Sequence, residues 1–388
     1  MIHLLHPDAP PSSADAQAAL QALSFAWTEL LRPSVWTAGL TGALATWGLS
    51  TLARRWGWVD AARGPDGSRK LQSVPAPLVG GTAVLLGLFA AWCVARVLGE
   101  SSGWGVSPLL DMPSWSTLGG TIGIDRPATW CALLCAFAVG LVDDLRTGGL
   151  SPRAKLVGQT VAGGLLVAPS LWLVAQGSSE FAAWVPLAWV LGAVVVQNAI
   201  NTFDNADGTA TSLASLALLF SAPAAAAALL GFLPFNLLGR VKRRRGPREP
   251  RRPVERPYLG DSGSHLLGLL ILIHPLAWPV LLLPALDLAR VAWVRWRLGF
   301  SPFAGDRRHL AHRLAAAGLS SFAVVSVLLM IAAPTLIATL RAASESFARE
   351  SLWGAPRWIP LGVFASIVLF VVAVYATPDP DQRGVPQR

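Results

Sequence analysis

Five aspartates stand out in this chain because each borders a long apolar run. They lie in the motifs "GLVDDLRTGG" (Asp143 and Asp144), "NTFDNADGTA" (Asp204 and Asp207) and "YLGDSGSHLL" (Asp261). A carboxylate beside an apolar segment is costly unless a cation or a set of donors lies next to it. Mg2+ prefers carboxylate and phosphate oxygens, so the pattern predicts a magnesium site that also receives phosphate. For each motif taken alone, a helix cap or a solvated helix end remains the alternative.

The second motif carries more than a cap requires. Asn201, Asp204 and Asp207 are spaced by three residues, which places them on one side of a helix or tight turn, and Gly208 lets the chain turn away. An N-cap of the next helix would explain one aspartate, but it would not explain two aspartates together with three asparagines. In the third motif, "SGS" opens an apolar helix whose N-terminal amides favour phosphate.

Basic residues suited to anions accompany the aspartates. In "GDRRHLAHRL", His309 and His312 share a helical face next to Arg313. A zinc site would need a third ligand, so we interpret the motif as an anion-binding cluster. Lys70 precedes a Pro/Gly-rich segment and Lys155 follows the Asp143–Asp144 pair; both are candidate phosphate-binding lysines. Together the motifs predict phosphoryl transfer involving a membrane-bound acceptor, in which Mg2+ neutralises phosphate charge.

The elements that position these residues are predicted to lie in a membrane. Of 388 residues, 53% are hydrophobic and only 14% are charged, whereas soluble domains carry roughly 25% charged residues. The formal net charge of +9 does not indicate nucleic acid, because the basic residues gather in residues 240–256 and at helix ends.

Cys93, Cys131 and Cys135 lie in apolar runs and are expected to be buried thiols. No cleaved signal is expected at the N-terminus.

Hydropathy predicts an all-α, polytopic integral membrane protein with about 10–11 transmembrane helices. The expected long spans are residues 34–53, 77–98, 128–142, a fourth ending near 174, 184–203, 316–340 and 358–376. Two further segments, 209–235 and 262–290, are interpreted as short or partly re-entrant hairpins that bend at "SAPAA" and at Pro275 and Pro279. A helix of about 13 residues rises only about 20 Å, less than a hydrocarbon core of about 30 Å.

Alternate loops are basic, which predicts that these loops and all five aspartates face the cytoplasm. Residues 1–33 then form a non-cytoplasmic segment. Residues 34–340 form the membrane-embedded domain, with the Arg- and Pro-rich segment 240–256 as a basic cytoplasmic insertion. Residues 341–388 contain the last transmembrane helix and the C-terminal tail. The insertion is predicted to be disordered and suited to anionic lipid headgroups.

Four motifs, in order between about Gly57 and Leu314, resemble those of the polyprenyl-phosphate N-acetylhexosamine-1-phosphate transferase superfamily (glycosyltransferase family 4). The superfamily includes GlcNAc-1-phosphate transferases and phospho-N-acetylmuramoyl-pentapeptide transferase. The motifs are "LVDDLRTGGLSPRAKLVGQ", "NAINTFDNADG", "GFLPFN" with "YLGDSGS", and "DRRHLAHRL". The resemblance implies transfer of an N-acetylhexosamine-1-phosphate from a UDP-sugar to undecaprenyl phosphate, with release of UMP. This would be the first membrane step of cell-envelope polysaccharide synthesis, in the inner (plasma) membrane.

The resemblance also implies roles for single residues. Asp143 matches the acid that acts on the lipid phosphate, and Asp144 and Asp261 match the metal-binding acids. Asp204 and Asn201 match residues of the same cleft, and His309, His312 and Arg313 match the loop that contacts the sugar and phosphates. The matches around the nucleotide are Lys70, Asp207 and Asn236. Lys155 is a further substrate-binding candidate. A phosphate monoester has a second pKa near about 6, so we expect positioning to matter more than proton abstraction by Asp143.

The implied cofactor is Mg2+, with Mn2+ as an alternative, and the implied partners are the UDP-sugar, undecaprenyl phosphate and membrane lipids. A homodimer is left open. Departures from the family pattern are Ala311 in "HLAH", where relatives commonly have histidine, Thr209 in place of the usual leucine, the basic insertion and the two short hairpins. These keep two alternatives open: the muramoyl-pentapeptide enzyme, which the histidine motif disfavours, and a degenerate, non-catalytic scaffold. A transporter is disfavoured because the acids lie near one face.

Overall fold

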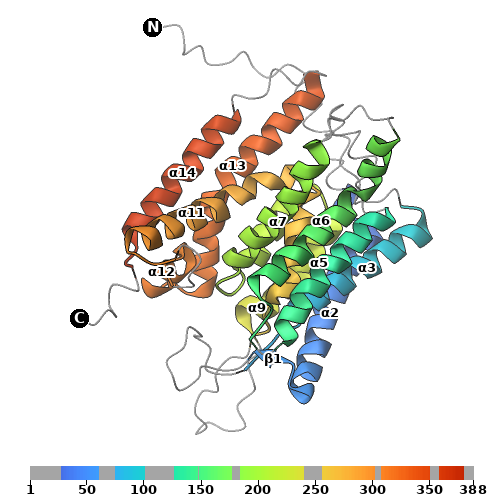
Figure 1. The fold of residues 1–388 in the computed structure, drawn as a ribbon, viewed down its shortest axis with the longest axis horizontal. Helices are drawn as coiled ribbons and strands as arrows, with labels where there is room; N and C mark the ends of the chain where they lie inside the picture. The colour runs from blue at the N-terminus through green and yellow to red at the C-terminus, as the bar shows by residue number, and fades with distance from the viewer. Residues whose placement is uncertain are drawn as a thin grey trace.

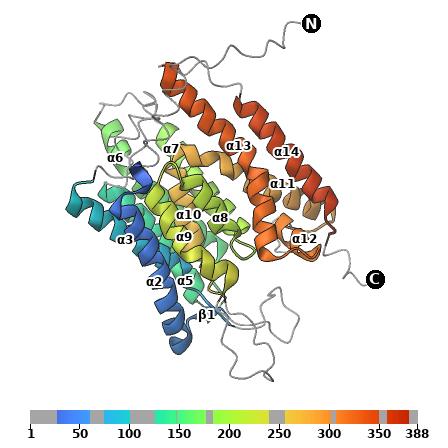
Figure 2. The same ribbon diagram turned by 180° about the vertical axis from the view of Figure 1, so that it is seen from behind.

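The chain folds into a bundle of α-helices with one short β-ladder (Figures 1 and 2). The computed structural model describes residues 28–60, 75–100, 126–146, 148–176, 184–239, 256–301, 307–349 and 358–379. Its helices are α2 (Pro33–Trp56), α3 (Gly80–Leu98), α5 (Pro127–Leu145), α6 (Pro152–Ala175), α7 (Trp184–Phe203), α8 (Thr209–Leu218), α9 (Pro223–Leu238), α10 (Gly260–Leu272), α11 (Leu282–Arg297), α12 (Leu310–Ala316), α13 (Ser321–Arg349) and α14 (Trp358–Ala376). A 3-10 helix, η2 (Pro275–Leu281), leads into α11, and strands β1 (Val59–Asp60) and β2 (Ala76–Pro77) pair antiparallel.

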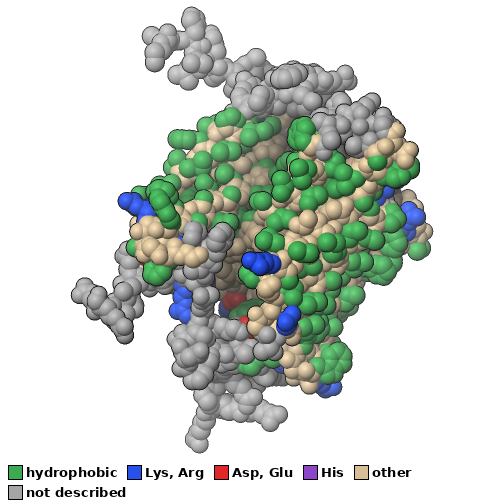
Figure 3. All heavy atoms as spheres, viewed as in Figure 1, with side chains coloured by type: hydrophobic (Ala, Val, Ile, Leu, Met, Phe, Trp, Pro, Cys, Tyr) green, Lys and Arg blue, Asp and Glu red, His purple; other side chains and the backbone are tan. Residues whose placement is uncertain are grey.

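The predicted class, an all-α multi-pass membrane protein, is confirmed. Within the described residues, seven helices are long and apolar enough to cross a membrane: α3, α5, α6, α7, η2 with α11, α13 and α14. The expected total of about 10–11 is reached only when α2 and the short helices α8, α9 and α10 are counted as well. Hydrophobic side chains cover much of the outer surface in Figure 3, as lipid contact requires.

The first predicted hairpin is present as two short helices, α8 and α9, which pack against each other. The chain reverses between them at residues 219–222, and Pro223 occupies the first turn of α9, where its missing N–H is not needed. The predicted bend at "SAPAA" is thus confirmed.

The second predicted hairpin is only partly right. Its first limb, α10, has 13 residues, and the chain bends after it at Ile273 and His274. The second limb was expected to be equally short, but η2 and α11 together form a 23-residue candidate span from Pro275 to Arg297. Pro275 lies in the first turn of the 3-10 segment, where proline is tolerated, and Pro279 lies inside that segment; neither ends the limb.

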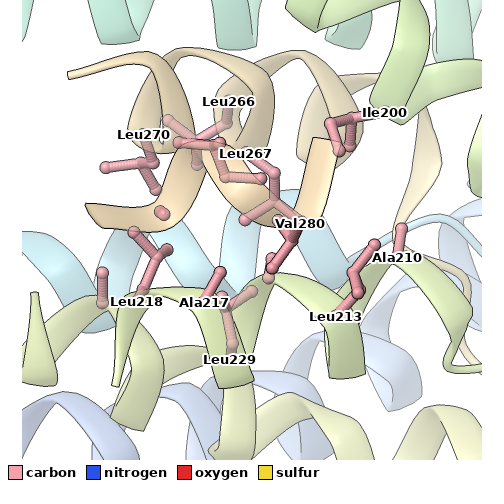
Figure 4. Packing of buried hydrophobic residues seen from close by; sticks show 14 of the residues in the cluster. Ile200, Ala210, Leu213, Ala217, Leu218, Leu229, Leu266, Leu267, Leu270 and Val280 are labelled. Carbon is pink, nitrogen blue, oxygen red and sulfur yellow. The ribbon is translucent and has the colours of Figure 1, made fainter. Parts of the chain in front are cut away.

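The short helix α10 lies at the centre of the bundle. Every residue from Ser262 to Leu272 is buried, and the helix packs on α5, α7 and α3. Figure 4 shows Leu266, Leu267 and Leu270 facing apolar side chains of α8 and α9. Because neighbouring helices surround α10, its length is not set by the thickness of the bilayer.

The end of α5 lies in close contact with the start of α10. A Cβ atom added at Gly140 would overlap the backbone of Asp261 and Ser262, and one added at Gly260, whose φ is +76°, would meet the Asp144 carboxylate at 2.5 Å. Glycine at these two positions therefore allows the two elements that carry Asp143, Asp144 and Asp261 to approach.

Several predicted regions fall outside the described residues. These are Lys70, nearly all of the N-terminal segment 1–33, and residues 240–255 of the basic insertion. Helix α13 continues through the predicted domain boundary at residue 340 and ends at Arg349.

The α5–α10 contact leads to a first prediction. Gly140→Ala would force backbone atoms apart and is expected to destabilise the fold by about 1–3 kcal/mol, the usual range for overpacking. Gly164→Ala in α6 is the matched control, because nothing lies within 4 Å of the added Cβ. Thermal unfolding of both variants in the same detergent measures the difference, and equal melting temperatures would contradict the assignment of this contact.

Candidate active site

All three aspartate motifs line one cavity of about 950 Å3. The ends of α5 and α7, the start of α10 and the paired strands β1 and β2 contribute to its wall, together with α12 and α13. In Figure 3, acidic side chains are visible in a hollow near the lower end of the bundle. The lining acids are Asp60, Asp143, Asp144, Asp204, Asp207 and Asp261. The predicted convergence of the five motif aspartates at one end of the helices is therefore observed.

Lys155 joins two of the motifs. Its ammonium nitrogen lies 2.8 Å from Oδ2 of Asp143 and 2.6 Å from Oδ2 of Asp261. The other carboxylate oxygen of Asp143 accepts the backbone N–H of Leu150 at 2.5 Å. Lys155 comes from the first turn of α6, so this helix supplies the positive charge that allows two carboxylates from α5 and α10 to lie close together.

Asp144 has a different environment from its neighbour. Its Oδ1 accepts the backbone N–H of Asp261 at 2.9 Å and its Oδ2 accepts that of Ser262 at 3.0 Å. These amides belong to the first turn of α10, where a negative charge is favourable. The helix N-terminus that the "SGS" motif led us to expect as a phosphate site thus holds the Asp144 carboxylate.

Asp204 and Asp207 differ in their access to positive charge. Arg256 forms an ion pair with Asp207 and also donates to the Ser321 hydroxyl at 3.2 Å. Burial raises the pKa of Asp207, and Arg256 opposes that rise. For Asp204, burial together with the nearby carboxylates of Asp261, Asp207 and Asp144 raises the pKa to about 8. Within the described residues, no ion pair neutralises Asp204.

The residues fit a Mg2+ ion that is bound together with phosphate. Within the described residues, no group of three or more His, Cys, Asp or Glu side chains forms a ready metal site. Mg2+ commonly keeps several waters and uses one or two carboxylates plus substrate phosphates, so such a group is not required. Asp204, which lies among acids and lacks a cationic partner in the described chain, is the place in this cavity where a cation is most needed.

The two predicted asparagines line the cavity and also hold its walls together. Asn236 accepts the N–H of Gly208 at 2.6 Å and donates to the carbonyl of Pro257 at 2.9 Å, so it links two motifs. Asn201 donates to the Ser264 hydroxyl at 2.9 Å. Thr209, where relatives carry leucine, donates to the carbonyls of Phe203 and Ala206 and thereby closes the loop that holds Asp204.

Of the histidine motif, only His312 lies among the described residues that line the cavity. His309 is buried, with its Nδ1 2.8 Å from Oδ2 of Asp287. Arg313 donates to the carbonyls of Val374 and Thr377 at the end of α14. The expected contacts of these side chains with a sugar or phosphate remain predictions, and in this structure His309 and Arg313 position α12.

Sequence reasoning missed four residues. Three of them line the cavity: Asp60, Arg256 and Tyr258. The fourth, Asp287, is hydrogen-bonded to His309. Arg256 was assigned to the basic insertion, although its place just before "YLGDSGS" could have indicated it. Burial, with the charges of Asp207 and Asp60, raises the pKa of Tyr258 to about 12, so its hydroxyl remains protonated at neutral pH. Asp287 could have been found from the sequence, because an acid within an apolar run commonly marks a functional position.

Comparison with known proteins finds one family model that matches the central part of the chain. Residues 127–278, which contain the first three motifs and most of the cavity wall, match the family model described as glycosyl transferase family 4. This match covers less than half of the chain, and over these residues the chain is similar to glycosyl transferase family 4.

Two groups of relatives are similar over most of the chain. A protein of Mycolicibacterium smegmatis named decaprenyl-phosphate N-acetylglucosaminephosphotransferase is 28% identical over 73% of this chain and 75% of its own length. A Mycobacterium tuberculosis protein of the same name is 28% identical over 75% of this chain and 78% of its own. A Yersinia pestis protein named undecaprenyl-phosphate alpha-N-acetylglucosaminyl 1-phosphate transferase is 28% identical over 60% of this chain and 68% of its own.

The raised pKa of Asp204 leads to a second prediction, for protein without divalent cations. The ordinary carboxyl pKa is 3.8 and the folded value is about 8. Between these values the folded state holds a proton that the unfolded state has lost, so stability falls as pH rises from about 4 to about 8. Asp204→Asn removes this contribution, and its melting temperature should exceed that of the wild type more at pH 8 than at pH 5. Parallel melting curves of the two proteins would contradict the assignment.

Proposed function

We propose that this chain transfers N-acetylglucosamine-1-phosphate from UDP-GlcNAc to a polyprenyl phosphate and releases UMP. A phosphate oxygen of the lipid attacks the β-phosphorus of the sugar nucleotide, and the bond from this phosphorus to the oxygen that bridges to the α-phosphate breaks. The bridging oxygen leaves on UMP. The relatives are named for N-acetylglucosaminephosphotransfer to decaprenyl or undecaprenyl phosphate, which supports the sugar and the acceptor class.

One observation carries the proposal: acids of all three motifs and Lys155 converge on one cavity at the end of the membrane helices. A lipid phosphate anchored in the bilayer meets a nucleotide from the aqueous phase at such a place. The basic loops support an orientation in the inner membrane in which the cavity opens toward the cytoplasm. UDP-sugars are available on that side.

The described side chains have separable tasks in this reaction. Lys155 holds Asp143 and Asp261 together and offers a positive charge to a phosphate. Asp144 fixes the first turn of α10, and Asn236 holds the loop of Asp207 against residue 257. Asp204 and Asp261, with Asp144, would hold Mg2+. When bound, this ion would neutralise the pyrophosphate and the charge that develops on the leaving phosphate.

The third prediction concerns activity. In vesicles that contain a polyprenyl phosphate and Mg2+, radiolabelled UDP-GlcNAc should yield lipid-linked label and UMP in equal amounts. Asp143→Asn and Asp261→Asn remove carboxylates that Lys155 joins, and each is expected to lower the rate by about a hundredfold or more. Glu29→Gln, which breaks an ion pair with Arg32 outside the cavity, serves as the control. Absence of product with every UDP-N-acetylhexosamine would favour the non-catalytic scaffold.

The fourth prediction concerns the metal. Chelation of divalent cations should abolish transfer, and Mg2+ should restore it. Mg2+ should also raise the melting temperature at pH 8, because it neutralises acids that otherwise repel each other. Asp204→Asn should reduce this stabilisation. An equal Mg2+-induced shift in wild type and variant would remove Asp204 from the cation site.

A further inference from the structure

Asp287 is an ionisable residue in an apolar segment that the proposed reaction does not use. It lies in α11, inside the 23-residue candidate span Pro275–Arg297, and is 1% exposed. A charged side chain at such a position is costly, and where it is retained it faces the protein interior, is paired and commonly serves a function. The partners of Asp287 therefore indicate what that function is.

Three donors surround the Asp287 carboxylate. His309 Nδ1 lies 2.8 Å from Oδ2, while the backbone N–H of Leu310 and Nη2 of Arg290 donate to Oδ1 at 3.0 and 2.9 Å. Leu310 is the first residue of α12, so Asp287 caps this helix from a neighbouring element. A negative charge at a helix N-terminus is favourable, and three donors offset the cost of burying it.

The same cluster holds the chain on both sides of His309. Arg290 also donates to the carbonyl of Arg308, so two side chains of α11 bind three successive residues of the histidine motif. At the other side of α12, Arg313 is bound to the carbonyls of Val374 and Thr377. Figures 1 and 2 show α12 beside the ends of α13 and α14, next to α11. Between these anchors, His312 lines the cavity.

We propose that Asp287 is a positioning residue for the transfer reaction. It fixes the ring of His309 and the first turn of α12, and so holds His312 at the cavity. The proposal rests on the function proposed above. An ionised carboxylate only accepts hydrogen bonds, so His309 carries its proton on Nδ1, which leaves Nε2 as an acceptor. Asparagine at 287 has the same shape but one acceptor oxygen and one donor group, so it cannot accept from all three donors.

The kinetic test uses the full chain in lipid nanodiscs with UDP-GlcNAc, a polyprenyl phosphate and Mg2+. Asp287→Asn is expected to lower kcat/KM by roughly ten- to a hundredfold, with a raised KM for UDP-GlcNAc, because a cavity group is displaced. A purely structural role would reduce only the amount of active protein, which lowers the apparent kcat and leaves KM unchanged. Glu29→Gln is the matched control, because it breaks another acid–arginine pair spaced by three residues, away from the cavity.

A second measurement does not depend on activity. In 15N-histidine NMR spectra, the His309 signals, assigned by their loss in His309→Gln, should show a proton on Nδ1. In Asp287→Asn they should shift toward the Nε2–H form. If wild type transfers no sugar phosphate, the proposed function fails, and this measurement still tests the pairing. An Nε2–H tautomer in wild type, or unchanged KM and kcat in Asp287→Asn, would overturn the proposal.

Arg290→Lys provides a second variant should Asp287→Asn not fold. It keeps the positive charge beside Asp287 but loses the guanidinium, whose Nη2 donates to both Asp287 and the Arg308 carbonyl. We expect a smaller rise in KM than in Asp287→Asn, with the His309 tautomer retained. Wild-type kinetics in this variant would contradict the anchoring of the histidine motif by α11.

Discussion

The contact between the end of α5 and the start of α10 is the constraint on which the rest of the site depends. Asp144 accepts the first backbone amides of α10, and Gly140, one turn earlier, leaves room for the backbone of Asp261. Once these helices meet, Asp143 and Asp261 are close enough for Lys155 to contact both. A wider separation would leave two half-buried carboxylates without a shared cation. The aspartates of two motifs more than 100 residues apart in sequence therefore work as one unit only at this helix separation.

The acids of the cavity differ in the positive charge that lies next to them. Lys155 compensates Asp143 and Asp261, the N-terminus of α10 compensates Asp144, and Arg256 compensates Asp207. Asp204 is left among them without such a partner in the described chain, and its pKa is raised to about 8. The protein thus supplies positive charge for most of its acids and leaves one acid whose ionisation is unfavourable without a cation. A bound cation would favour the ionised form of this acid, which would couple metal binding to the stability of the cavity.

The sequence predicts the long helices and the convergence of the acids well, because both follow from local signals. Apolar runs of about 20 residues identify spans, and basic loops that alternate along the chain place Asp143, Asp204 and Asp261 at one end of the bundle. The pairings are not predictable in this way. Whether Lys155 contacts Asp143, or Asp287 contacts His309, depends on how α6 and α11 rotate about their axes, and many distant contacts set that rotation. The two prolines misled for the limb that begins at Pro275, because η2 and α11 continue past them as one 23-residue candidate span.

The departure "HLAH" has a simple structural interpretation. In α12, Leu310, Ala311 and Leu314 are buried in the core, while His312 and Ala315 face the cavity. A histidine at 311 would place a polar ring among apolar side chains, at a cost unless a partner were present. The position at which relatives commonly carry a histidine is therefore a packing position in this chain. Alanine at this position therefore does not remove a side chain from the cavity wall. The histidine that lines the cavity is His312, in α12, the helix that Asp287 caps.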